Sequence, residues 1–125
     1  MKSLLLTLLL ITAASGMNSA FAQTNLEVKA FVQKLKETPN AQLLDVRTPE
    51  EWNAGNIKSS KCVNVKSTEF NQQIEKLDKN KPVFVYCMAG VRSAKASKIL
   101  KEAGFKEIYN LQDAGYPDLI KEGLK

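Results

Sequence analysis

The sequence predicts an α/β fold, a single domain with a mainly parallel central sheet flanked by helices on both faces. Short runs of apolar, β-forming residues alternate along the chain with segments of helical periodicity, and the connections between them are short. Residues 23–125 have the length of one small domain, without internal repeats, low-complexity tracts or long linkers. One core and no second domain are therefore expected.

The chain after residue 23 should open with a helix. Asn25 is a suitable N-cap, and the helix should end before Pro39. Its apolar residues recur at helical spacing: Leu26, Ala30, Phe31 and Leu35. Residues 42–46 (QLLDV) then read as a short buried strand.

A capping box follows this strand. Thr48 stands at the N-cap, Pro49 at the first helical position and Glu51 at the third, so a short helix should start here and stop by Gly55. Residues 62–65 (CVNV) are the next strand candidate. Ser67 or Thr68 should open another helix, with Phe70, Ile74 and Leu77 at helical spacing.

The last part of the chain contains its most β-like stretch, residues 82–86 (PVFVY). Residues 93–103 are rich in helix formers, and Gly104 sits where a residue of left-handed conformation commonly follows a helix. Residues 107–111 (EIYNL) form the expected final strand, and residues 117–121 a short closing helix.

The first 22 residues resemble a signal peptide. Lys2 supplies a positive charge, Leu4 to Ala14 is largely apolar, and Ala20-Phe21-Ala22 fits a signal-peptidase site. We therefore expect residues 1–22 to be removed and residues 23–125 to form an exported domain, periplasmic in a bacterium. An uncleaved N-terminal anchor is the alternative.

The amino-acid composition excludes several kinds of catalytic and metal-binding site. Histidine is absent, which excludes Ser-His-Asp and Cys-His catalytic arrangements, and two cysteines without histidine make a metal site implausible. The net charge of +5 comes mostly from dispersed lysines, so a solvated surface is favoured over nucleic-acid binding. Only Arg47 and Arg92 are arginines, which suggests positions that need a planar guanidinium.

The segment YCMAGVRS, residues 86–93, carries the candidate chemistry. Cys87 follows the β-like run and precedes a helix, at the edge of the sheet where α/β folds bind ligands. Gly90 allows the loop to curl and turn its N–H groups inward, which makes an anion cradle that also favours a thiolate. Arg92 adds a positive charge. A buried packing role for Cys87 is the competing interpretation.

The neighbouring motifs favour the nucleophile. Three motifs follow one another along the chain: LLDVR at 43–47, EEWNAGNIK at 50–58 and CMAGVRS at 87–93. In the order and separation of these motifs, the chain resembles the rhodanese-like family of single-domain sulfurtransferases. The resemblance departs from the family pattern at Asn56, where histidine is usual, at Leu119, where tryptophan is common, and in Asp113-Ala114-Gly115, which carries one residue more than the usual Gly-Gly turn.

The resemblance implies a sulfurtransferase without a bound cofactor or metal. Cys87 would take a sulfane sulfur from thiosulfate or a persulfide and pass it to a thiol or to cyanide, and the loop residues Met88, Ala89, Gly90, Val91 and Arg92 would stabilise the persulfide anion. The six-residue loop from Cys87 to Arg92 resembles the sulfurtransferase version, because related phosphatases and arsenate reductases have one residue more. Because Met88, Ala89 and Val91 are uncharged, a persulfide or protein-bound donor is slightly favoured over thiosulfate.

Asp45, Arg47 and Ser93 are expected to support the site rather than touch the sulfur. Arg92 either binds the donor or braces the loop against a carboxylate such as Asp45, and bracing is favoured. Trp52 is expected to be a packing residue. Cys62 is expected to pack within a strand, with a redox-linked bridge to Cys87 as the alternative.

Two other functions stay open at this point. The chain could be a persulfide carrier that serves one partner protein, because a carrier needs the same loop, or less plausibly a cysteine-dependent phosphatase. The expected partners are a small sulfur compound, thiosulfate or a persulfide, and a thiol acceptor, either a small molecule or a partner protein. A monomer is expected, with neither nucleic acid nor, after leader cleavage, a membrane.

Overall fold

The computed structural model describes residues 23–125, and the predicted signal peptide lies outside the described residues. Strands and helices alternate, as expected. Five strands form one sheet: β1 (Gln23–Leu26), β2 (Gln42–Asp45), β3 (Ser60–Cys62), β4 (Val83–Tyr86) and β5 (Ile108–Leu111). The helices are α1 (Val28–Glu37), α2 (Pro49–Ala54), α3 (Phe70–Ile74), α4 (Val91–Glu102) and α5 (Tyr116–Lys121).

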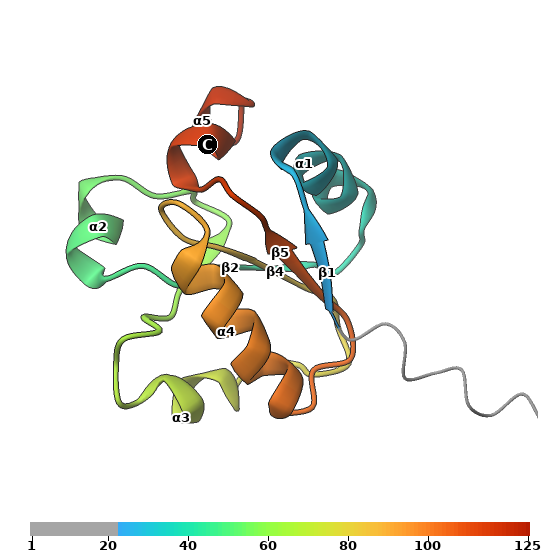
Figure 1. Ribbon diagram of the computed structural model, residues 1–125, viewed down its shortest axis with the longest axis vertical. Coiled ribbons are helices and arrows are strands. Elements are labelled where there is room, and N and C mark those ends of the chain that lie inside the picture. The colour runs from blue at the N-terminus through green and yellow to red at the C-terminus, as the bar shows by residue number, and fades with distance from the viewer. Residues whose placement is uncertain (1–22) are drawn as a thin grey trace, which may run out of the picture.

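The sheet has the order β1-β5-β4-β2-β3, and every neighbouring pair is parallel (Figure 1). β4 lies at the centre, and all four of its residues are buried. This explains its continuous apolar sequence, since a parallel strand covered on both faces has no solvent side. The predicted α/β class with a parallel sheet is confirmed.

Helices cover both faces of the sheet (Figure 1). Val83 and Val85 of β4 pack into one core with residues of α3 and α4, including Phe70 and Leu100. The alternate residues of β4, Phe84 and Tyr86, point to the other face, where a second core includes α1 and Leu119 of α5. The alternation follows from the two-residue period of a strand. Among residues 23–125, no helix has the length and apolar character needed to cross a membrane.

The start of the domain differs from the prediction. Residues 23–26 form β1, which pairs with β5, and α1 begins at Val28 after Glu27, so Asn25 is not a helix cap. Asn25 instead lies in the strand and accepts a hydrogen bond from buried Asn110 at 3.1 Å. Pairing with β5 outweighs the local capping preference, and a single sequence carries no signal for that partner.

Other element boundaries shift by a few residues. β3 covers 60–62 rather than 62–65, although Val63 and Val65 still donate backbone hydrogen bonds to Asp45 and Val46. α3 begins at Phe70, because the Ser67 hydroxyl accepts from the N–H of Glu69 and forms a turn before the helix. α2 has the predicted capping box at Thr48, and α4 begins two residues earlier than expected.

Candidate functional site

Cys87 lies directly after the central strand β4 and is 1% exposed. The following loop curls so that two backbone N–H groups point at its sulfur: Gly90 N lies 3.1 Å and Ser93 N 3.3 Å from Sγ. Gly90 adopts the left-handed region, with φ of 105°, as the residue that precedes α4. The loop therefore folds around the sulfur as the sequence predicts, and glycine is needed where the backbone reverses.

The loop stabilises the thiolate form of Cys87. Burial by itself would raise the pKa of this thiol, but hydrogen bonds from Ser93, Gly90 and Ala89 outweigh burial and lower the pKa below its ordinary value. The N-terminus of the twelve-residue helix α4 adds a positive partial charge at the same place. Cys87 is thus sheltered from water, and the groups around it favour its thiolate form.

Ser93 connects this loop to the neighbouring strand. Its side chain is fully buried, and its hydroxyl can donate to the carbonyl oxygen of Gly90 at 3.2 Å or of Leu111 at 3.4 Å. The same hydroxyl contributes to the lowered pKa of Cys87. Ser93 therefore holds the turn of the loop against the end of β5 and supports the sulfur through both its backbone and its side chain.

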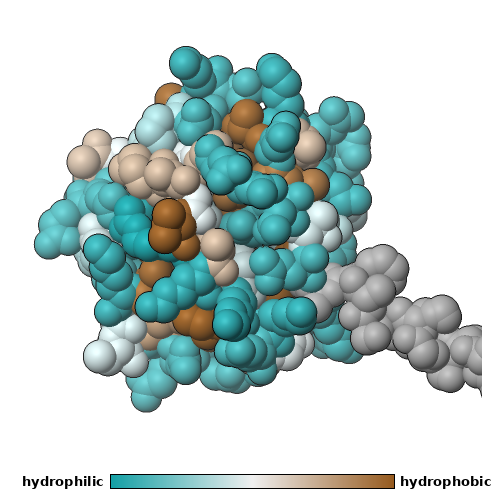
Figure 2. All heavy atoms as spheres, viewed as in Figure 1, coloured by the Kyte–Doolittle hydropathy of each residue, from teal (hydrophilic) through white to brown (hydrophobic). Residues whose placement is uncertain are grey.

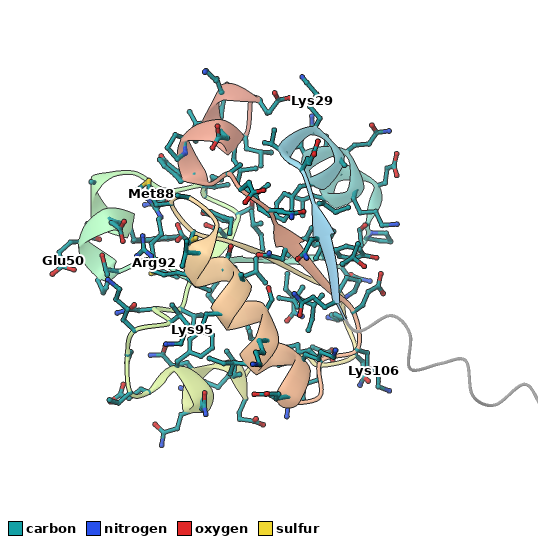
Figure 3. All side chains as sticks on the ribbon, in the orientation of Figure 1. Lys29, Glu50, Met88, Arg92, Lys95 and Lys106 are labelled. Carbon is teal, nitrogen blue, oxygen red and sulfur yellow. The ribbon has the colours of Figure 1, made fainter. Side chains whose placement is uncertain are left out.

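Arg92 braces the loop, but its partner is not Asp45. Its two terminal nitrogens donate to the Glu51 carboxylate, Nη1 to Oε1 at 2.7 Å and Nη2 to Oε2 at 2.9 Å. Figure 3 shows Arg92 between the first turn of α4 and helix α2. The hydrogen bonds from Arg92 lower the pKa of Glu51 to about 2. Asp45 is unavailable to Arg92 because Arg47 occupies it.

Asp45 and Arg47 form a buried ion pair at the end of β2. Arg47 Nη2 lies 2.7 Å from Asp45 Oδ2, and the guanidinium Nε bonds both carboxylate oxygens, at 2.9 and 3.0 Å. The same Nη2 donates to the carbonyl oxygen of Gly55 at 2.8 Å, and the ring of Tyr116 lies 4.2 Å from the guanidinium carbon. The pair therefore ties β2 to the end of α2 and to α5.

The segment that closes the cysteine loop was not among the predicted site residues. The N–H of Tyr116 donates to the carbonyl oxygen of Cys87 at 2.8 Å, and a Cβ on Gly115 would stand 1.9 Å from the carbonyl oxygen of Met88. Likewise a Cβ on Gly90 would stand 2.9 Å from the backbone nitrogen of Asp113. The only sequence signal for this contact is the glycine at 115. The contact itself joins segments almost thirty residues apart.

The outer surface of the loop is uncharged. Val91 is 81% exposed, Ala89 is exposed, and Met88 is half-buried. Figure 2 shows hydrophobic atoms at the surface over the start of α4. The exposed loop residues Ala89 and Val91 therefore offer aliphatic groups, and the nearest exposed lysine of α4, Lys95, lies one turn further along the helix.

Comparison with known proteins identifies the family. The model of the rhodanese-like domain matches residues 28–119. The chain belongs to the rhodanese-like domain family. A rhodanese-like domain protein from Staphylococcus aureus has a similar structure, with a TM-score of 0.69 and 28% identity over 82% of this chain and 96% of that one.

Several curated relatives contain the same domain within a longer protein. The uncharacterised protein YqhL of Bacillus subtilis is 39% identical over 58% of this chain and 56% of its own length. The tRNA uridine(34) hydroxylase of Pelagibacter ubique is 39% identical over 63% of this chain, but only 27% of its own length is covered. YrkF of Bacillus subtilis, provisionally named a sulfur carrier protein, is 29% identical over 69% of this chain and 45% of its length.

The three departures from the usual rhodanese-like pattern are accommodated locally. Asn56, at the usual histidine position, donates from its side chain to the carbonyl oxygen of Trp52 at 2.9 Å and so caps the end of α2. Leu119 is fully buried in the core beside α1. Asp113 takes up the extra residue in a left-handed turn, with φ of 55°.

Trp52 is only half-buried and belongs to neither core, so its packing role is weaker than expected.

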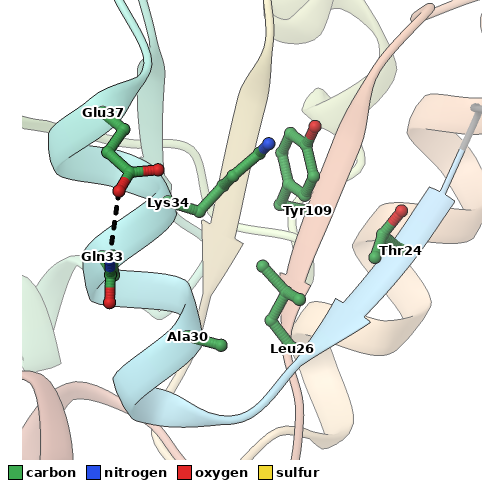
Figure 4. Close-up of a pocket in the computed structure, with 7 residues that line it drawn as sticks. All are labelled: Thr24, Leu26, Ala30, Gln33, Lys34, Glu37 and Tyr109. Atoms are coloured by element: carbon green, nitrogen blue, oxygen red, sulfur yellow. Dashed lines mark hydrogen bonds between the residues drawn. The ribbon is translucent and has the colours of Figure 1, made fainter.

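A surface groove lies away from the rhodanese-like loop. It is a groove of about 450 Å³ between α1 and the strands β1 and β5 (Figure 4). Lys34 lies over the ring of Tyr109 at 5.6 Å, and Gln33 donates to Glu37 at 3.0 Å. The two charged side chains of the groove, Lys34 and Glu37, thus each have a different partner, an aromatic ring and a side-chain amide. Among residues 23–125, no group of three or more His, Cys, Asp or Glu side chains could hold a metal ion.

Proposed function

We propose that this rhodanese-like domain is a sulfurtransferase that carries a sulfane sulfur as a persulfide on Cys87. The observation that carries the proposal is the pair of N–H groups, from Gly90 and Ser93, directed at the Cys87 sulfur at 3.1 and 3.3 Å. Such donors stabilise a thiolate before the reaction. They also line a cradle in which the terminal sulfur of a persulfide can find N–H partners.

The reaction proceeds in two balanced steps. The Cys87 thiolate attacks the outer sulfur of thiosulfate, the S–S bond of the donor breaks, and sulfite leaves with the bonding electrons while Cys-S-S⁻ remains. With a persulfide donor R-S-SH, the leaving group is the thiol R-SH. In the second step an acceptor, a thiolate or cyanide, attacks the terminal sulfur and regenerates the Cys87 thiolate. No histidine base is needed, because the N–H groups of the loop lower the pKa of Cys87 and favour its thiolate.

The relatives support the sulfur chemistry at the level of the domain. One of them, YrkF, carries the provisional name of a sulfur carrier. The hydroxylase relatives share only this domain-sized part of their length, so hydroxylation is not carried over to this chain. What is shared is a domain-sized region, and sulfur transfer through Cys87 is the function that the loop of this chain supports best.

The test is the intact mass of reduced protein before and after incubation with thiosulfate or with a low-molecular-weight persulfide. We expect the wild-type chain to gain one sulfur atom from at least one donor and a Cys87→Ser variant to gain none. A Cys62→Ser variant is the matched control and should gain sulfur as the wild type does. If neither donor loads the wild type, the proposal fails.

A persulfide carrier for one protein is the second candidate, and the uncharged, exposed surface of Ala89 and Val91 favours it. Turnover separates the two: a carrier loads once but transfers slowly to small thiols and cyanide. A phosphatase is disfavoured, because Arg92, the cation of the loop, is paired with Glu51.

We further propose that the domain is exported after cleavage near Gln23. The support is the positive Lys2, the apolar run from Leu4 to Ala14 and the Ala20-Phe21-Ala22 site. Cell fractionation with N-terminal sequencing of the recovered protein tests this. A cytoplasmic protein that keeps Met1 would contradict it.

A further inference from the structure

We propose that Glu51 is a positioning residue that engages the guanidinium of Arg92 at the end of the cysteine loop and thereby makes the site select a persulfide donor over the thiosulfate dianion. The inference rests on the proposed sulfurtransferase function and names the donor class for the same site. It depends on the direction of the Arg92 guanidinium, the only one in the loop. It also depends on which other loop groups can meet a donor while Arg92 is paired with Glu51.

The Glu51–Arg92 contact is two-pronged and partly shielded. Both carboxylate oxygens are engaged, at 2.7 and 2.9 Å, and the two side chains are 28% and 21% exposed. Glu51 is also fixed from its other side, because its Oε1 accepts from the N–H and the hydroxyl of Thr48, both at 3.0 Å. A planar pair held in this way is harder to exchange for a solvated ion than a single lysine contact.

What remains at the loop suits a different donor. Met88, Ala89 and Val91 bring no charge, and the N–H groups of Gly90 and Ser93 are already directed at the sulfur of Cys87. Thiosulfate would bring a dianion, with its charge shared between the sulfonate and the outer sulfur, towards a thiolate while the guanidinium of Arg92 is engaged by Glu51. A persulfide R-S-SH brings no such group, and its carbon portion can lie against exposed Val91.

The favoured loading step is balanced without a further reactant. Cys87-S⁻ attacks the outer sulfur of R-S-SH, the S–S bond of the donor breaks, and its electron pair leaves on the inner sulfur. The inner sulfur takes the proton to give R-SH, while Cys87-S-S⁻ keeps the negative charge.

The test compares Glu51→Gln with Glu50→Gln. Glutamine is accepted at the third helical position of a capping box, so the first variant keeps the start of α2 while removing the charge that holds Arg92. The second variant makes the same change of net charge at an exposed neighbour in the same helix. The measured quantity is the ratio of kcat/KM for the persulfide of 2-mercaptoethanol, whose carbon portion is uncharged, to kcat/KM for thiosulfate, with cyanide as the acceptor in both cases.

We expect wild type and Glu50→Gln to share a high ratio, and Glu51→Gln to lower it by about tenfold, because a released guanidinium adds one charged hydrogen bond to the sulfonate. Adding Arg92→Gln to Glu51→Gln should restore the wild-type ratio. An equal loss with both donors, which leaves the ratio unchanged, would mean that Glu51 is merely structural and would overturn the proposal.

Arg92→Gln alone gives an independent test that does not depend on the folding of the Glu51 variant. If Arg92 is held away from the donor, this change should leave the donor ratio within about twofold of wild type. A twofold change is smaller than the effect of losing one charged hydrogen bond. A selective loss of thiosulfate activity would show that Arg92 contacts the donor. Failure of the wild type to load from either donor would instead reject the sulfurtransferase function itself, so the two failures are distinct.

Discussion

Cys62 and Cys87 are both shielded from solvent, yet their pKa values move in opposite directions. Burial raises the pKa of Cys62, the nearby Asp45 charge adds to the rise, and its sulfur has only a long contact, 3.8 Å, to the carbonyl oxygen of Arg47. Cys87 is more deeply buried, but N–H donors face its sulfur and its pKa falls. The hydrogen-bond donors of the loop, rather than exposure, distinguish the two thiols.

This contrast predicts two separate thiol titrations. With Cys62→Ala, the remaining Cys87 should ionise below the ordinary value of 9.0, and with Cys87→Ala the remaining Cys62 should ionise above it. Thiolate forms as pH rises, so the lower pKa means that Cys87 is the more ionised thiol at neutral pH. Ultraviolet absorbance of the thiolate, followed against pH in each variant, gives both midpoints. Coincident midpoints would contradict the role of the loop.

The buried pair of Asp45 and Arg47 leads to a stability prediction at the same scale. Asp45→Asn should lower the free energy of unfolding by about 3 kcal/mol or more, because Arg47 would stay buried with an uncompensated charge. Urea unfolding measures this loss. The exposed Asp113→Asn change is a control and should stay within about 0.5 kcal/mol. A loss at Asp45 no larger than the control's would mean that the pair is not buried in solution.

Local sequence patterns predict the helices and strands that hold the site, but they do not predict its long-range contacts. The capping box at Thr48, the buried strand β4 and the helix after Gly90 follow from residue spacing alone. The partner of Arg92 does not follow from residue spacing, because Glu51 is forty-one residues away in the chain. The sequence suggests Asp45 as the carboxylate instead. The strand β1 was missed for the same reason, since only its pairing with β5 makes it a strand.

The contact between the turn before α5 and the cysteine loop gives a prediction at the scale of elements. Gly115→Ala would place a methyl group 1.9 Å from the Met88 carbonyl oxygen, so we expect a loss of about 3 kcal/mol or more in unfolding free energy together with slower sulfur loading. Gly104→Ala is the matched control, because a methyl group there meets open space. It should cost about 1 kcal/mol from its left-handed backbone alone, with normal loading. Thermal unfolding and the mass assay check both variants. Equal losses would argue against the close approach.

At the scale of the whole molecule, the strand order gathers distant segments at one edge of the sheet. The chain leaves β2 towards β3 on one side, and leaves β4 towards β5 on the other (Figure 1). The carboxyl ends of β2 and β4 therefore border the crevice where the connections diverge, which is the usual ligand position in such sheets. The alternation of strands and helices predicts the parallel sheet, whereas the strand order has to come from the structure.

The same strand order separates the two thiols. Cys62 pairs with Asp45 on β2, and Asp45 pairs with Tyr86 on β4, so two strand spacings, about 10 Å, divide Cys62 from the residue before Cys87. A disulfide needs Cα atoms within about 7 Å. Both cysteines are free in the structure. The redox-linked bridge considered from sequence would thus require the end of the sheet to open.

We therefore expect mild oxidation of the protein with diamide to leave no intramolecular bridge. After oxidation, alkylation under denaturing conditions and intact-mass measurement should find no species in which both cysteines are linked within one chain. The Cys62→Ala variant, which cannot form such a bridge, should lose sulfur-loading activity under diamide at the same rate as wild type, because oxidation then acts on Cys87 alone. A cross-linked monomer, or protection of activity in that variant, would mean that the edge of the sheet opens in solution and that Cys62 regulates the nucleophile.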